Sequence, residues 1–133
     1  MLAYGLPPLF GSLASGAPRF AAIALIACAI AFAFWAKRTL GSAFTPFPRP
    51  VESGQLAVTG PFAFVRHPIY TSMVAMCASW AWLWQSEVGA GCAVVLFAFF
   101  DQKARREERW LAEAYAGYGE YRARVKRLVP WIY

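Results

Sequence analysis

The loop from Thr59 to Tyr70, which contains Arg66, His67 and Pro68, is the densest group of residues in this sequence that could do chemistry. Pro68 fits the first position of a helix, because the N–H that proline lacks would have no partner there. The residue before a proline favours extended backbone, so His67 is predicted to lie at the mouth of that helix. The free amide groups of the first turn, residues 69–71, attract anions, and the Arg66 guanidinium adds positive charge beside them. We therefore expect a site for a carboxylate or a phosphate here.

Glu107 and Glu108 form a second candidate group. On a helix, Glu107 shares one face with the apolar residues Trp110 and Leu111, and Lys103 lies one turn before it. A carboxylate on an apolar face is costly unless a cation meets it. One of the two glutamates is therefore expected to receive the ammonium group of a ligand. The other five acidic residues have no comparable setting.

Each group also has a purely structural interpretation, which the sequence leaves open. Arg66 and His67 could form only a charged flank and a helix cap, and Lys103 and Glu107 could form an ion pair on a solvated face. The motifs of a nucleotide-binding site and of a nucleophile–histidine site are absent: the sequence has no glycine-rich phosphate loop and no second histidine to pair with a nucleophile. The three cysteines lie in apolar runs without metal-ligand spacing, which is typical of buried packing residues.

The composition indicates that a membrane positions these residues. A length of 133 residues suits one domain, and 59% hydrophobic residues is too many for an ordinary soluble chain. Three apolar runs cover residues 20–36, 69–84 and 88–100, each shorter than the roughly 20 residues of a full span. Continuing the third helix past Asp101 and Lys103 would supply the missing length. Only Gln85-Ser86-Glu87 separates the second and third runs, so these two are predicted to form an antiparallel hairpin.

The basic residues predict the orientation of the chain in the membrane. All but one of the 13 lysines and arginines lie between the first and second runs or after the third. By the positive-inside rule, the loop at 38–67 and the tail are cytoplasmic, and the N-terminus lies outside. In so apolar a chain, the net charge of +6 favours attraction to anionic lipid headgroups over binding of nucleic acid.

We therefore expect an all-α integral membrane protein with about three transmembrane helices and a cytoplasmic amphipathic C-terminal helix. The single domain would comprise an extracytoplasmic arm (1–18), a first helix (19–38), a cytoplasmic loop (39–67), a helical hairpin (68–100) and a cytoplasmic helix and tail (101–133). The tail helix has apolar residues at helical spacing, up to Tyr115 and Tyr118, and Trp131-Ile132-Tyr133 would anchor it at the membrane interface. Short helices leave apolar surface that a second copy could cover, so a homo-oligomer is one possibility that the sequence leaves undecided.

Two motifs follow one another along the later part of the chain. The first is Gly60-Pro61-Phe62-x-x-x-Arg66-His67-Pro68-x-Tyr70. The second is Glu107-Glu108-x-x-Leu111, then Tyr118-x-x-Tyr121-x-x-x-Val125-x-Arg127-x-x-Pro130. Together they resemble the isoprenylcysteine carboxyl methyltransferase and phospholipid methyltransferase superfamily, over roughly residues 40–133. The resemblance implies a helical membrane enzyme that transfers a methyl group from S-adenosylmethionine.

The resemblance also implies roles for single residues. The stretch before the first motif, which includes Gln55 and Leu56, would help to hold the cofactor. The other residues implied to contact the cofactor are Phe62, His67, Pro68, Ile69, Tyr70 and Glu107. Lys103 stands where the family commonly has an arginine associated with the substrate, a change that weakens any bidentate contact there. Arg66 and Glu108 are expected to orient the methyl acceptor.

The chemistry of this cofactor agrees with the two candidate groups. Its carboxylate suits the helix mouth with Arg66 and His67, its ammonium suits Glu107, and its sulfonium suits the ring of Phe62 or Tyr70. The sequence thus predicts a membrane methyltransferase acting on a lipid-like acceptor, either the carboxylate of an isoprenylated thiol compound or a lipid headgroup. One alternative is an NADPH-dependent, sterol-type membrane reductase, although little sequence is left to hold a dinucleotide. The other is a non-enzymatic membrane scaffold subunit.

Overall fold

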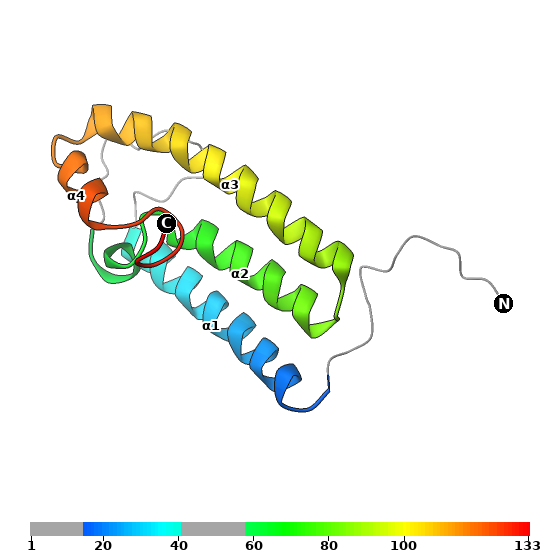
Figure 1. Cartoon of the computed structure of the whole chain (residues 1–133). Coiled ribbons are helices and arrows are strands. Elements are labelled where there is room, and N and C mark those ends of the chain that lie inside the picture. Colours follow the sequence, from blue (N-terminus) through cyan, green and yellow to red (C-terminus); the bar gives the residue numbers. More distant parts are fainter. Residues whose placement is uncertain (1–14, 41–57) are drawn as a thin grey trace.

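The computed structural model describes residues 15–40 and 58–133, and every regular element in this part of the chain is helical. The elements are α1 (Ala17–Leu40), the short 3-10 helix η2 (Gly60–Ala63), α2 (Pro68–Leu83), α3 (Glu87–Ala114) and α4 (Tyr118–Arg124). α2 lies between α1 and α3 and packs against both, so that the three long helices form one layer (Figure 1). The expected all-α fold class is confirmed for these residues.

α1 is the one helix of the described residues that is long and apolar enough to cross a membrane. Large apolar side chains such as Phe20 and Phe34 are 70% and 61% exposed on its surface. α2 has only 16 residues, and the 28 residues of α3 include the charged segment that begins at Asp101. The expected number of three transmembrane helices is therefore not confirmed.

α2 and α3 form the predicted antiparallel hairpin (Figure 1). α2 begins at Pro68, the position predicted for this residue. The connection between the helices turns through Gln85, which has a left-handed φ of 45°. Ser86 then caps α3, because its hydroxyl accepts a hydrogen bond of 3.0 Å from the amide of Gly89. The two helices approach closely at this end: a Cβ on Gly89 would lie 3.0 Å from the Cβ of Ala81.

α3 continues through the expected boundary between hairpin and tail at residues 100 and 101. No glycine or proline interrupts the chain there, and an ion pair of 3.0 Å between Asp101 and Arg105 spans the first turn after the junction. The helix ends at Ala114, and Tyr115 adopts extended backbone. The amphipathic pattern up to Tyr118 is thus divided between the end of α3 and the separate helix α4.

The loop before α2 is fixed by contacts with α1 and with the segment after α4. Gly60 has a φ of +61° and packs so closely on α1 that a Cβ would lie 3.1 Å from the Thr39 hydroxyl. The amide of Arg66 donates to the carbonyl of Lys126 over 2.8 Å, and the amide of His67 donates to that of Arg127 over 3.1 Å. The segment after α4 is therefore bound directly beside the mouth of α2.

The close approach at Gly89 generates a test of the hairpin. Gly89→Val should lower the free energy of unfolding by about 1–3 kcal/mol, because the added atoms overlap the backbone and side chain of Ala81. Gly91→Val is the matched control, since a Cβ there meets no atom of the described residues within 4 Å. Thermal unfolding of the detergent-purified protein measures both. Equal melting temperatures for the two variants would contradict this packing.

Candidate functional site

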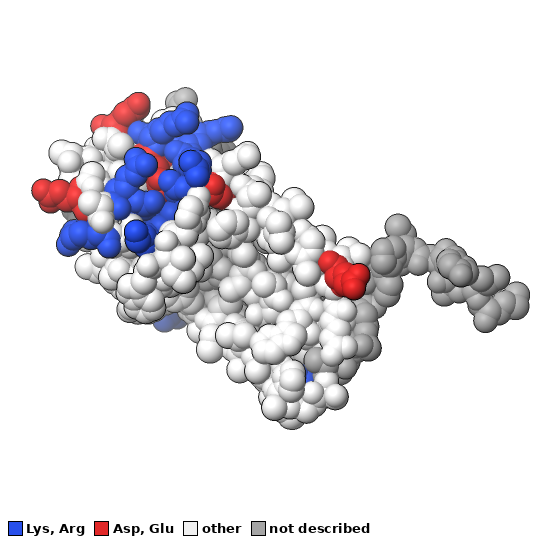
Figure 2. Space-filling view, in the orientation of Figure 1, with Lys and Arg blue, Asp and Glu red and all other residues white. Residues whose placement is uncertain are grey.

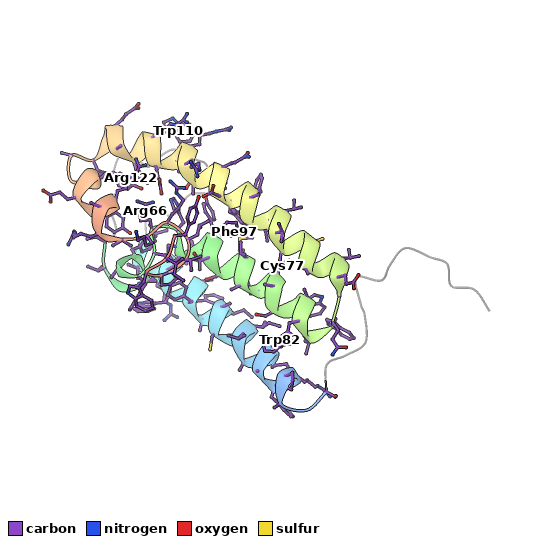
Figure 3. The ribbon with its side chains drawn as sticks, in the orientation of Figure 1. Arg66, Cys77, Trp82, Phe97, Trp110 and Arg122 are labelled. Atoms are coloured by element: carbon purple, nitrogen blue, oxygen red, sulfur yellow. The ribbon has the colours of Figure 1, made fainter. Side chains whose placement is uncertain are left out.

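Most of the charged residues visible in Figure 2 gather at one end of the layer. This end is built from the second half of α3, α4 and the mouth of α2, and Arg66, Trp110 and Arg122 all lie there (Figure 3). Cys77 and Trp82 lie farther along the bundle, in its apolar part (Figure 3). The fold therefore brings the two candidate groups of the sequence to the same end of the molecule.

Glu108 is the centre of this end, although only 2% of its surface is exposed. The guanidinium of Arg127 binds it with two hydrogen bonds of 3.1 Å, one to each carboxylate oxygen. Nε2 of His67 lies 3.2 Å from Oε1. Nε of Arg66 lies 3.1 Å from the same oxygen, in a geometry that makes an ion pair but no hydrogen bond. The loop before α2 and the segment after α4 thus both contact this one buried carboxylate of α3.

These contacts determine the protonation of Glu108. Burial alone would raise its pKa, but hydrogen bonds from His67 and Arg127 and the charge of Arg66 outweigh burial and lower the pKa to about 2. Burial would lower the pKa of Arg127, yet its hydrogen bonds to Glu108 raise it. Burial does lower the pKa of Arg66 despite the attraction of Glu108. Glu108 is therefore ionised at neutral pH.

Glu107 lies beside Glu108 but has a different setting. The hydroxyl of Tyr70 donates a hydrogen bond to its Oε1. Nδ1 of His67 lies 3.7 Å from Oε2, and the Lys103 ammonium lies 4.0 Å from Oε1. Burial raises the pKa of Glu107 in spite of the opposing effects of Tyr70, His67 and Lys103. With 17% of its side chain exposed, Glu107 keeps a capacity to accept further donors that Glu108 lacks.

An aromatic stack continues from His67 along α2 and α3. The rings of His67 and Tyr70 are parallel with centroids 5.4 Å apart, and Phe100 stacks on Tyr70 at 4.6 Å. The Lys103 ammonium lies 5.0 Å from the centroid of the Tyr70 ring. Phe100 and Lys103 therefore already contact the ring that was expected to face a sulfonium, and the hydroxyl of Tyr70 is used by Glu107.

Other residues expected at the cofactor site have different positions. Phe62 is 7% exposed and belongs to a core cluster with Ala36, Tyr118 and Tyr121, whose hydroxyl binds the Phe62 carbonyl over 2.6 Å. Ile69 packs against this cluster from the first turn of α2. The cofactor contact expected of Phe62 stays a prediction. Gln55 and Leu56 lie outside the described residues.

The mouth of α2 keeps part of the expected anion site. The amide of Thr71 is already bonded to the carbonyl of His67 over 3.0 Å. The amides of Ile69 and Tyr70 are the first-turn donors that have no acceptor within the helix. The Arg66 guanidinium, expected beside them, instead pairs with Glu108 and donates to the Arg122 carbonyl over 3.0 Å.

No role was expected from the sequence for Arg127 or for Asp101. In the structure, Arg127 binds Glu108 on one edge and Asp101 on another, at 3.0 Å. The second motif could have indicated the pair of Arg127 and Glu108, because it contains both residues and a buried carboxylate requires a cation. Nothing local marked Asp101, because its partner lies 26 residues away.

A comparison with protein families now adds to this geometry. The model of the family described as phospholipid methyltransferase matches residues 18–117. The chain belongs to this family. No curated protein matches the chain. Membership confirms the resemblance inferred from the two motifs and supports a membrane-associated methyltransferase. The match covers α1 to α3 and ends before Arg127.

The buried cluster predicts how stability depends on pH. Because the pKa of Glu108 is lowered on folding, its stabilising contribution is present above the ordinary value of 4.5 and is lost as the pH falls toward about 2. Glu107 has a raised pKa, so its protonation at low pH acts in the opposite direction. We expect a net loss of melting temperature across this acid range, measured by thermal unfolding in detergent.

Glu108→Gln should remove most of that acid dependence and should cost about 3 kcal/mol or more at neutral pH, because two arginines then lack their carboxylate. The exposed Glu113 of the same helix supplies the control Glu113→Gln. If both variants lost stability equally, or if Glu108→Gln kept the full acid dependence, the central role of Glu108 would be wrong.

Proposed function

We propose that this protein is an integral membrane methyltransferase that takes its methyl group from S-adenosylmethionine and acts on a lipid-like acceptor. One observation carries the proposal: Glu107 lies against His67 at the mouth of α2, where the first-turn amides are. Groups that can bind an anion, the first-turn amides, thus lie beside a carboxylate that can bind a cation. An α-amino acid group carries both charges and would complement them.

The donor set fits the amino acid part of the cofactor. The amides of Ile69 and Tyr70 would bind its carboxylate, and Glu107 would bind its ammonium, for which its partly exposed carboxylate has capacity. When bound, the cofactor supplies a methyl group activated by a sulfonium. The protein then has to hold, orient and dry the reacting groups, because displacement at a methyl carbon needs no covalent enzyme intermediate.

Arg66 and Glu108 have different roles in this proposal from the acceptor contact expected of them. Both side chains are buried, 7% and 2% exposed, and they pair with each other. A group so enclosed cannot readily reach an acceptor. We assign them to positioning: they hold His67 and the start of α2 against α3. Lys103 is 29% exposed at the edge of the site and keeps the expected role toward an anionic part of the acceptor.

The proposed topology has α1, α2 and the apolar half of α3 crossing the membrane, with the charged end in the cytoplasm and the N-terminus outside. Exposed apolar side chains on all three helices support it, including Phe34, Trp82 and Val94 at 61%, 45% and 70%. Such side chains would be costly in water and suit lipid. The surface between the charged end and the far tip is almost free of charge in Figure 2.

Calorimetric titration of the detergent-purified protein with S-adenosylhomocysteine tests the proposal. We expect saturable binding to one site per chain, because the product keeps both charges of the amino acid part. A parallel titration with NADPH should show no binding. Failure of folded protein to bind S-adenosylhomocysteine would contradict the proposal, and binding of NADPH instead would favour the membrane reductase.

Glu107→Gln tests the role of this residue in the same assay. The amide still accepts a hydrogen bond from Tyr70 but has no negative charge for an ammonium. The dissociation constant for S-adenosylhomocysteine should rise about tenfold or more, as expected for the loss of a charge-assisted hydrogen bond. Glu113→Gln, on the exposed side of α3, should bind like the wild type. An unchanged dissociation constant for Glu107→Gln would exclude the ammonium contact.

A further inference from the structure

The turn at Val129–Tyr133 folds back onto α3 and is fixed by its own backbone. The carbonyl of Tyr133 accepts hydrogen bonds from Leu128 over 2.8 Å and from Val129 over 3.2 Å. Its amide donates to the carbonyl of Val129 over 3.0 Å. Trp131 adopts a left-handed φ of 62° and is 82% exposed. A strained, exposed residue thus precedes by two positions a tyrosine whose hydroxyl is hydrogen-bonded within the protein.

The phenol of Tyr133 lies within a cluster of charged groups. Its hydroxyl donates to Oδ1 of Asp101 over 3.0 Å and accepts from Arg105 over 2.9 Å and from Nη1 of Arg127 over 3.3 Å. The same Nη1 donates to Asp101 over 3.0 Å. The Arg127 guanidinium also lies 5.7 Å from the centroid of the Tyr133 ring. Tyr133 and Asp101 therefore both bind Nη1 of Arg127, and we call these two residues the bracket.

The other edge of Arg127 is the one that binds Glu108. Nε and Nη2 bind the two oxygens of Glu108, so every nitrogen of the guanidinium has a carboxylate partner. A guanidinium held only at Nε and Nη2 could still tilt relative to Glu108. The bracket fixes its plane, and Glu108 in turn binds Nε2 of His67.

We infer that Tyr133 and Asp101 are positioning residues of the methyl-transfer site, acting through Arg127 and Glu108 on His67. The inference rests on the proposed function and extends the site to a turn beyond the segment that the family model matches. The contacts run without a gap from Tyr133 to Arg127, to Glu108 and to His67, which faces Glu107 on its other nitrogen. Loosening the bracket therefore changes the geometry of His67 and, with it, the affinity of the cofactor site.

Tyr133→Phe tests this inference with little change in packing. The variant loses the hydroxyl but keeps the ring, which lies 6.1 Å from that of Phe97. His67 is the only histidine in the chain, so ¹⁵N-labelled histidine gives the signals of one imidazole. We expect the Nε2 signal to move and the dissociation constant for S-adenosylhomocysteine to rise about threefold to tenfold, with the melting temperature little changed.

Trp131→Asn is the matched control. It removes the exposed indole of the same turn, and asparagine tolerates the left-handed backbone. Neither the imidazole signal nor the affinity should change. Asp101→Asn is the second test variant, and it should move the imidazole signal as Tyr133→Phe does.

The outcomes separate this inference from the proposed function. Wild-type protein that fails to bind S-adenosylhomocysteine would overturn the proposed function, while the imidazole signal would still decide the role of Tyr133. An unchanged imidazole signal in folded Tyr133→Phe and Asp101→Asn overturns the inference, even if the wild type binds. So does unfolding of both variants, because the bracket would then hold the fold rather than the site.

Discussion

Burying the charge of Glu108 is the constraint on which the rest of the charged end depends. An isolated carboxylate inside a protein is far too costly to remain ionised, so its partners must come to it. They come from segments far apart in the sequence: Arg66 and His67 precede α2, and Arg127 follows α4. The ionic cluster therefore joins the helix layer to the segment after α4, and it explains why the chain returns to the mouth of α2.

The same constraint gives two neighbouring glutamates different chemistry. Successive residues on a helix point about 100° apart. Glu108 consequently points into the cluster, whereas Glu107 points toward Tyr70 and Lys103 at its edge. Both oxygens of Glu108 have partners, whereas the side chain of Glu107 remains partly exposed. His67 contacts both glutamates, with Nε2 toward Glu108 and Nδ1 toward Glu107, so the position of its ring depends on both carboxylates.

In the proposed topology, the arrangement of the layer decides which surfaces face the membrane and which face the cytoplasm. α2 lies between α1 and α3 (Figure 1), and both outer helices carry exposed apolar side chains. The charged end lies where the apolar surface stops (Figure 2). A site at this boundary suits an acceptor with an apolar body in lipid and a polar group at the surface. It also places the charged residues of α3 outside the apolar region, where ion pairs cost less.

The sequence by itself determined the helices, the hairpin and the start of α2, because apolar runs, a short connection and Pro68 are local features. The same local pattern picked out Glu107 as a carboxylate that needs a cation, and the two motifs indicated the family that the comparison confirmed. The contacts of Gln55 and Leu56 stay predictions, since these residues lie outside the described part of the chain.

Only the tertiary structure decided which of these residues are enclosed and which are open. The acceptor contacts predicted for Arg66 and Glu108 and the cofactor contact predicted for Phe62 stay predictions, but the fold buries all three side chains among partners from distant segments. It also brought in Arg127, Asp101 and Tyr133, and the hydrogen bonds of Arg127 and Tyr133 to α3 span 19 to 32 residues along the chain. Spacing in sequence reports neighbours one helical turn away. The partners of a buried charge depend on how whole segments pack, and no local pattern contains that information.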